Sequence, residues 1–418
     1  MKSEKNSNNL EELLIFLMQD QLNNENSDLI KEIIAIRKIS NKNNNDNLTK
    51  SLLIKNLSNN IKNISEIYID TILQKLNDLD FIEFDLSSKT EQIIFKTDNI
   101  LNILFYSRYC YYINNKYGPN CLKFFEYLLE HGSYKDNMDK FNKSDFGSLI
   151  RDGIIYKNKI KNIKNENLFN NNSIEIYKIN FQILNEILFK EYIINFYKNY
   201  ISMNFQFYDL FKKVINSNNY IYELKNYEKR NINFSQIFAD NFEYSKLLIK
   251  NDNNINDNKI LLNREIIKYD IFYNSVEKII NLFFSSKHVR IFKIIEVNPN
   301  LNIFQISQKA CLKFLEVQEI IEDLINKLNI IKKIKNEKEE FIYLLNDVDE
   351  ETIDMMKNNI YGIIKDIKYE LKDKLTQLQG KIDQDTILQY INKYFSLINT
   401  FSEILNSYNF LFYNINKT

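Results

Sequence analysis

The sequence contains few of the residues that form tight turns, disulfides or metal sites. Its 418 residues include only 6 glycines, 2 prolines, 3 cysteines and 2 histidines, and no tryptophan. The shortage of glycine and proline disfavours an all-β fold, whose many turns need them, and favours helices. The cysteines are far apart in the chain, so we expect small core residues in a reducing compartment: Cys110, Cys121 and Cys311.

The residue patterns of most enzyme classes are also missing from the sequence. Neither His131 nor His288 lies beside a cysteine or within an HExxH motif, and metal ligation by these residue types needs clusters. The chain has no glycine-rich loop of the kind that cradles phosphates. We therefore expect a protein without catalytic residues, metal or cofactor.

The charge balance argues against a dedicated DNA-binding protein. The chain carries 55 basic and 55 acidic residues, whereas tight DNA binding usually draws on a basic excess. It has no uncharged apolar run of about 18 residues, and its N-terminal segment turns acidic too early for a signal peptide. We expect a soluble intracellular protein with no membrane contact, in which any DNA contact is local or assisted by partners.

Hydrophobic periodicity is clearest near the C-terminus. Three amphipathic helices are predicted within 287–300, 302–312 and 314–329, and two alternating strands follow around a charged turn within 330–346. This is the order of a winged helix, a variant of the helix-turn-helix. The residues predicted to face the core are Phe304, Ile306, Ala310, Val317, Ile320, Ile321, Leu324 and Leu328.

The same order occurs at the N-terminus. Helices are predicted over 10–22, 29–39, 52–57 and 65–79, the last with Ser65 as its cap, and two short strands lie within 81–95. A unit that recurs in this way indicates small domains in series. The fold class is therefore mainly α with small β-wings, in domains that we predict over 1–98, 99–195, 196–284, 285–348 and 349–418.

The last predicted domain is a pair of helices. An apolar stripe steps by threes and fours, and a second stripe follows a turn near Gly380. We expect an antiparallel coiled-coil hairpin that packs on the last winged helix, docks on a partner, or does both. The residues of its first stripe are Ile353, Met356, Ile360, Ile363, Ile367 and Leu371.

The tyrosine-rich stretch 106–118 has three possible interpretations: a cofactor-binding segment, a platform for stacking nucleic-acid bases, and a buried helix. Its large apolar residues fall on one helical face, which is typical of a core helix. We therefore predict a structural role. The residues of this face are Leu101, Leu104, Phe105, Tyr109, Tyr112 and Ile113.

The candidate DNA contacts lie on the last hairpin. The third helix of each predicted winged helix would read DNA, but in the two clearest units it is acidic, with Glu316, Glu319, Glu322 and Asp323 in one and Glu66, Asp70 and Asp78 in the other. The last hairpin has a lysine cluster that would contact phosphates without reading sequence, unless it is only a solvated hairpin. The cluster is Lys332, Lys333, Lys335 and Lys338, and Lys287, Arg290 and Lys293 would extend it.

Three segments together resemble a known family. They are NILFYSRYCYYINNKYGPNCLKFFEYLLEHG (102–132), REIIKYDIFYNSVEKIINLFF (264–284), and SSKHVRIFKII (285–295) with the helices and hairpin that follow it. In their order they resemble the winged-helix, third-largest subunit of RNA polymerase III, which is itself similar to the alpha subunit of TFIIE. The segment 137–172 departs from the family pattern because it is short and rich in asparagine, and this puts the second wing in doubt.

The resemblance implies four winged-helix domains and a C-terminal coiled coil in a nuclear protein. It implies a peripheral heterotrimer with two other specific subunits on the clamp of the polymerase, where the chain would help to recruit initiation factors and open promoter DNA. It implies no catalytic role for this subunit.

Three other classes stay open, an initiation factor, a helical scaffold subunit and an enzyme, and the missing motifs count against the enzyme. An initiation factor like the TFIIE alpha subunit would normally carry a zinc ribbon, and the missing cysteine pairs count against it. A helical scaffold subunit of the proteasome-lid or signalosome kind would place one winged helix after helical repeats. The strand pair within 81–95 counts against that class, because it places a wing too early in the chain.

Overall fold

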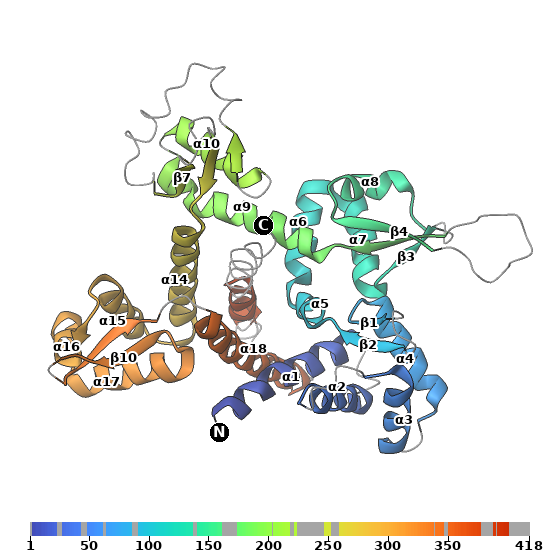
Figure 1. The fold of residues 1–418 in the computed structure, drawn as a ribbon, viewed down its shortest axis with the longest axis horizontal. Coiled ribbons are helices and arrows are strands. Elements are labelled where there is room, and N and C mark those ends of the chain that lie inside the picture. Colours follow the sequence, from blue (N-terminus) through green and yellow to red (C-terminus); the bar gives the residue numbers. More distant parts are fainter. Residues whose placement is uncertain are drawn as a thin grey trace, which may run out of the picture. The chain divides into compact units, whose positions relative to one another are not determined.

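The chain is mainly helical with small antiparallel sheets, which confirms the predicted class in its coarse form. The computed structural model describes residues 2–22, 27–42, 48–61, 64–85, 91–136, 140–160, 174–202, 204–217, 221–223, 246–251, 259–337, 339–346, 350–377, 388–389 and 391–400 (Figure 1). The chain divides into two compact units. Unit 1 comprises Met1–Leu184 with Ile360–Tyr390, and unit 2 comprises Asn185–Asn359 with Ile391–Thr418.

One order of elements occurs four times: a helix, a short strand or single bridge, and a two-stranded hairpin. In the first, second and fourth repeats a helical segment is described directly before the hairpin. The first repeat contains α2 (Ser27–Lys42), α3 (Lys50–Asn60), α4 (Glu66–Asp78), β1 (Ile82–Asp85) and β2 (Gln92–Phe95). The second contains α7 (Pro119–His131), β3 (Tyr134–Lys135), α8 (Lys143–Arg151), β4 (Ile155–Ile160) and β5 (Ile174–Ile179).

The third and fourth repeats follow the same order. The third contains α10 (Phe205–Asn216), β6 (Ile221–Glu223), β7 (Leu248–Asn251) and β8 (Lys259–Leu262), and residues 224–245 lie outside the described part of the chain. The fourth contains α15 (Ser286–Val297), β9 (Leu301–Asn302), α16 (Ile303–Ala310), α17 (Phe314–Asp323), the π-helical turn η4 (Leu324–Leu328), β10 (Ile331–Lys335) and β11 (Phe341–Leu345).

In every repeat the segment between the first helices pairs with the last strand of the hairpin. The sheets have the orders β3-β5-β4, β6-β8-β7 and β10-β11-β9, and in the first repeat Thr49 forms an antiparallel bridge with Gln92. The pairing is antiparallel throughout, for example Tyr134 with Tyr177 and Leu301 with Tyr343. The hairpin is thereby tied to the helices of its own repeat.

A further helix precedes each repeat. These helices are α1 (Lys2–Gln21), α6 (Tyr106–Tyr117), α9 (Phe181–Ile201) and α14 (Arg264–Phe283), and α6 itself follows α5 (Thr97–Leu101) and the 3-10 turn η1 (Asn102–Phe105). The predicted domain boundary at 195/196 falls inside α9, and the one at 284/285 follows α14. By the recurring order, α9 and α14 lead the third and fourth repeats.

Local side-chain caps start several of these helices. Thr49 accepts a hydrogen bond from the Leu52 amide at the start of α3, and Ser65, as expected, accepts one from Tyr68 at the start of α4. At α16, Asn302 and Gln305 form a reciprocal capping box. Such caps satisfy amide groups that the first helical turn leaves without partners.

The second hairpin, which the sequence put in doubt, is present. β4 and β5 pair along six residues, from Ile155 with Ile179 to Ile160 with Ile174. The asparagine-rich residues 161–173 between them lie outside the described part of the chain. The second repeat therefore has the same hairpin as the others.

The tyrosine-rich segment is part of the core. All six residues of its predicted apolar face are buried, and the Tyr109 hydroxyl donates a hydrogen bond to Asn102 Oδ1 at 2.9 Å. Lys116, one turn beyond Tyr112, is exposed, and its ammonium donates a hydrogen bond of 2.6 Å to the Tyr112 hydroxyl at the edge of this face. This face packs in the protein interior and is closed to nucleic-acid bases.

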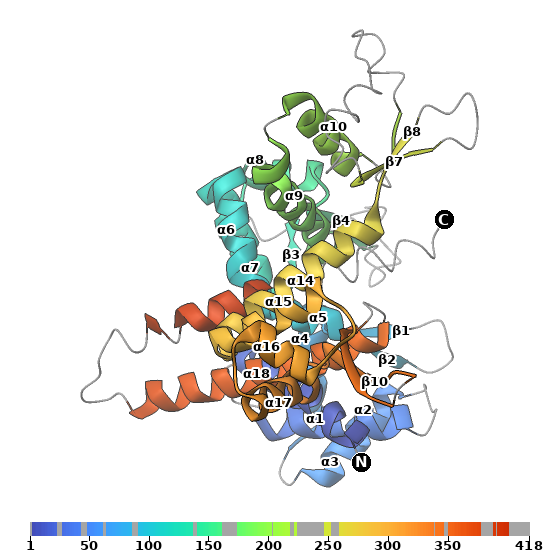
Figure 2. The ribbon, with the colours of Figure 1, turned by 90° about the vertical axis from the view of Figure 1, so that its left-hand side faces the viewer.

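The helix that carries the predicted tail stripe also packs inside the chain. In unit 1 the helix α18 (Glu350–Gln377) lies beside α1, as Figures 1 and 2 both show. Lys365 Nζ lies 2.5 Å from Glu12 Oε2, and the rings of Tyr369 and Phe16 meet edge to face with centroids 5.5 Å apart. Lys365 and Tyr369 are outside the predicted stripe, so α18 packs on α1 through another of its faces.

The positions of the stripe differ in detail from the prediction. Met356, Ile360 and Ile367 are buried, whereas Ile363 is half-buried and its neighbour Ile364 takes the buried place. The side chains of Ile353 and Leu371 lie outside the described part. Residues 391–400 are helical, but the predicted turn near Gly380 is also outside it, so the coiled-coil hairpin stays a prediction.

The first two repeats meet closely where α7 ends. Gly132 has φ +76°, and a Cβ built on it would lie 2.0 Å from the carbonyl oxygen of Asp78 at the end of α4. Beside this contact, Lys96 Nζ lies 2.8 Å from Asp80 Oδ1, and Lys178 Nζ lies 4.0 Å from the same atom. The backbones approach so closely that only glycine fits at position 132.

The glycines of unit 1 give a graded test of this contact. We expect Gly132→Ala to destabilise the unit by about 2–6 kcal/mol, because it adds overpacking to backbone strain. Gly118→Ala should cost only the strain, about 1–3 kcal/mol, since φ is +86° there but nothing lies within 4 Å. Urea unfolding of the two variants and the wild type should show this order.

Gly147→Ala is the matched control. Gly147 lies inside α8 with open space around it, so alanine should stabilise the helix by about 0.5–1 kcal/mol. Equal effects of the three substitutions would contradict the close contact at Gly132.

Candidate functional site

The lysines predicted to contact DNA lie on both faces of the fourth hairpin. Lys333 of β10 is opposite Tyr343 of β11, and Lys335 is opposite Phe341. Side chains alternate along a strand, so Lys333 and Lys335 share one face and Lys332 lies on the other. Lys338 lies outside the described part of the chain. The described lysines of the predicted cluster are therefore divided between the two faces of the hairpin.

Lys333 and Lys335 are both held near one aromatic ring. Their ammonium nitrogens lie 4.0 Å and 5.6 Å from the centroid of Phe341. A cation over an exposed ring gains about 0.5–1 kcal/mol. The same turn carries the exposed Glu339 and Glu340, so the hairpin offers an ordered but weak positive charge.

The three basic residues of α15 that were expected to extend the cluster have partners inside the fourth repeat or on α14. Lys287 forms an ion pair with Glu316, and Arg290 donates to the Ala310 carbonyl oxygen at 3.2 Å. Lys293 lies between Glu277 and Glu296, at 2.7 Å and 3.0 Å. Burial opposes the charged form of Lys293, but the two carboxylates outweigh it and raise its pKa. These residues hold the repeat together.

The helices in the third position of the first and fourth repeats expose mainly carboxylates. Glu319 and Glu322 are exposed on α17, and Glu66 and Asp78 are exposed on α4. DNA phosphates would repel these groups. The arrangement agrees with the expectation that neither helix reads bases.

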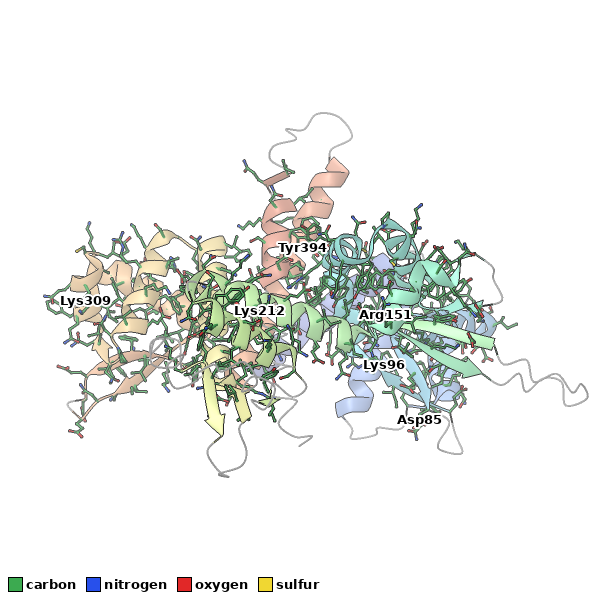
Figure 3. The ribbon with its side chains drawn as sticks, turned by 90° about the horizontal axis from the view of Figure 1, so that it is seen from above. Asp85, Lys96, Arg151, Lys212, Lys309 and Tyr394 are labelled. Carbon is green, nitrogen blue, oxygen red and sulfur yellow. The ribbon has the colours of Figure 1, made fainter. Side chains whose placement is uncertain are left out.

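The helix before the hairpin of the second repeat, α8, is more basic than α4 and α17. It was not among the candidates predicted from the sequence. Lys143 begins α8 and Arg151, labelled in Figure 3, ends it; both are exposed. Lys143 Nζ lies 2.8 Å from Asp136 Oδ2 and 3.6 Å from Glu175 Oε2, so its charge is already balanced within the repeat.

Glu175 is the centre of this charge network. It forms an ion pair with Lys157 and accepts a hydrogen bond of 2.9 Å from the Tyr177 hydroxyl. The bond from Lys157, followed by that from Tyr177, lowers the pKa of Glu175 to about 2. The network therefore fastens β4, β5 and the start of α8 to one another.

A groove in the fourth repeat, which was not predicted from the sequence, brings together exposed aromatic rings. It has a volume of about 500 Å³ and runs between α17 with η4 on one side and the hairpin on the other. Phe304, Phe314 and Phe341 line it while remaining 59%, 45% and 45% exposed. Lys333 of the predicted cluster is also part of its lining.

Phe304 does not occupy its predicted place. A core position was expected for it together with Ile306 and Ala310, but only these two are buried. Phe304 lies in the first turn of α16, and its ring is exposed instead of joining the buried face that contains Ile306 and Ala310. In the sequence it is indistinguishable from a further apolar residue of that face.

The cysteines do not share one environment. Cys121 is buried and its thiol donates to the Asp145 carbonyl oxygen at 2.8 Å, but Cys311 is exposed, so the core prediction is wrong for it. Cys311 has φ +53° because it ends α16 in the left-handed conformation. Burial raises the pKa of Cys110 to about 11, which keeps its thiol protonated and unreactive.

The described residues hold neither a metal-ligand cluster nor a membrane-spanning helix. Within that part of the chain, His, Cys, Asp and Glu side chains nowhere gather in groups of three or more that suit a metal ion. None of the helices that the structure describes is both long and apolar enough to cross a bilayer.

Comparison with known proteins gives no relative. No family model matches the chain, and none of the curated proteins matches it significantly.

The Glu175 network predicts a pH dependence in unit 1. A lowered pKa stabilises the fold above the ordinary glutamate value of about 4.3, and the contribution is lost as pH falls toward 2. Hydrogen exchange of residues 174–179, corrected for intrinsic rates, should show protection falling over this range. Glu175→Gln should flatten the profile, and Glu319→Gln, on the exposed face of α17, should leave it unchanged. A wild-type profile in Glu175→Gln would refute the assignment.

Proposed function

We propose that the chain is a non-catalytic subunit of DNA-directed RNA polymerase III in the nucleus. The four repeats are winged-helix domains, and α18 with the helix at 391–400 forms the C-terminal coiled coil. The subunit joins two other specific subunits on the clamp of the polymerase and assists promoter opening in the transcription of small RNA genes.

The observation that supports this proposal is the fourfold recurrence of one topology. A winged helix has a short strand after its first helix that joins the sheet of the wing, and each repeat has this pairing. A scaffold subunit of the proteasome-lid kind would be expected to carry one such unit after helical repeats. An initiation factor like the TFIIE alpha subunit would bring a zinc ribbon. A chain of four units fits the polymerase subunit best.

The mechanism is positional. Acidic third helices make the first and fourth repeats poor readers of bases, so their surfaces serve partner subunits. The fourth hairpin contributes lysines that contact phosphates without sequence preference once partners hold the DNA close. The tail helix α18 docks on partner subunits, and its apolar stripe holds the helix in place. The stripe is formed by Ile353, Met356, Ile360, Ile363, Ile367 and Leu371.

Affinity purification of the full chain from nuclei of its own organism tests the assignment. We expect the large subunits of RNA polymerase III and two further specific subunits to copurify in comparable amounts. Recovery of proteasome-lid or signalosome subunits instead would overturn the proposal, and recovery of a TFIIE-like partner with RNA polymerase II would favour the initiation-factor alternative.

The hairpin lysines generate a second prediction. Replacing Lys332, Lys333 and Lys335 with Glu should weaken DNA retention by the assembled polymerase. The slope of log K against log salt should fall by about 0.9 for each phosphate that the hairpin no longer neutralises. Subunit assembly should stay intact, because these side chains are at the surface of the repeat.

The matched control replaces the same lysines with Arg, which keeps their charge. We expect retention and salt slope at wild-type values in this variant. An unchanged slope in the Glu variant would show that the hairpin is only solvated and makes no phosphate contact.

A further inference from the structure

The groove of the fourth repeat has the length of a polypeptide-binding site. One wall follows the helical segment from Phe314 through Gln318 and Glu322 to Asn326, all of which line the cavity. At a helical rise of about 1.5 Å per residue, this wall is about 18 Å long, or roughly three helical turns. The opposite wall is the hairpin, with Lys333, Glu340, Phe341 and Tyr343.

The lining is apolar and accessible. Ile303, Ile321 and Ile325 line the groove beside the three exposed phenylalanines. Exposed rings that converge on one depression are unusual on a folded surface and mark interaction sites. Phenylalanine side chains in such a position bury large areas when a partner covers them.

The charge on the rim indicates the kind of partner. Glu322 and Glu340 both line the groove, and neither carboxylate forms an ion pair with any residue in the described part of the chain. Other carboxylates of α17 are paired, Glu316 with Lys287 and Asp323 with Lys327. Glu322 accepts a hydrogen bond of 3.1 Å from Gln318 Nε2, which leaves its negative charge in place. Among the described residues the rim therefore has two carboxylates without an ion pair against one ammonium, that of Lys333 over Phe341.

We propose that this groove binds a peptide segment of another protein that carries apolar anchor residues and lysine or arginine side chains. The anchors fill the space between Phe304, Phe314 and Phe341, and the basic groups pair with Glu322 and Glu340. Nucleic acid is disfavoured inside the groove, because its phosphates would face these two carboxylates. The inference goes beyond the polymerase assignment, since it holds for any complex that the chain joins.

Selection from a displayed library of random 16-residue peptides, with the full chain as target, tests the proposal. We expect enriched peptides to combine aromatic or aliphatic anchors with a net positive charge. The enriched peptides, made synthetically, should protect residues 314–326 from hydrogen exchange. Phe304→Ala with Phe314→Ala should weaken their binding by about tenfold or more, since each removes an anchor contact.

Two further variants distinguish binding in the groove from non-specific hydrophobic binding elsewhere on the surface. Glu322→Lys with Glu340→Lys should weaken the binding of basic peptides by a similar factor, and these exposed substitutions leave the core unchanged. Phe205→Ala is the matched control, because Phe205 is 77% exposed on α10, outside the groove, and its loss should have no effect. Thermal unfolding of each variant verifies that the fold persists.

Three outcomes would overturn the proposal. The first is the enrichment of peptides that bind the double phenylalanine variant as tightly as the wild type. The second is the enrichment of acidic or uncharged peptides only. The third is protection of residues 314–326 by a 20-nucleotide single-stranded DNA in place of peptides, which would assign the groove to nucleic acid.

Discussion

The fold depends on the antiparallel pairing of one very short strand with the last strand of each hairpin. An isolated two-stranded hairpin is marginally stable in water, and the hairpins here have strands of only four to six residues. The third strand, reduced to a single bridge at Thr49 in the first repeat, supplies the missing hydrogen bonds and anchors the sheet to the helices. This pairing fixes the position of the side chains on each hairpin, including the lysines of β10.

Each repeat buries its apolar residues and leaves most of its charged residues at the surface. Apolar side chains at helical spacing close the core of each repeat, while the carboxylates of α4 and α17 stay outside. Basic residues are mostly matched to acidic ones nearby, as Lys143 is to Asp136 and Lys287 to Glu316.

Most of the fold prediction came from hydrophobic periodicity along the sequence. The stripe from Val317 to Leu328 repeats at helical spacing, and the structure buries each of its predicted members. Strands of two residues, such as β3 and β9, have no period to detect, so the pairing that closes the sheets was beyond sequence reasoning. The predicted boundary at 195/196 lies inside α9, because composition does not change along this helix.

The candidate site was less accessible to prediction than the fold. The lysine cluster was predicted from the sequence, but the placement of Lys332 on one face and of Lys333 and Lys335 on the other depends on the register of β10 with β11. The groove depends on residues from α16, α17 and the hairpin, which only the tertiary structure brings together. Phe304 illustrates the limit, since a single aromatic residue near a helix start does not reveal which way its ring points.

The contact between α1 and α18 links residues that are more than 350 positions apart, such as Glu12 and Lys365. During translation α1 can pack early on α2 and α5, because both follow it closely in the chain. Its contacts with α18, by contrast, form only when nearly the whole chain has emerged, so the edge of α1 that carries Glu12 and Phe16 is the last part of this helix to be covered.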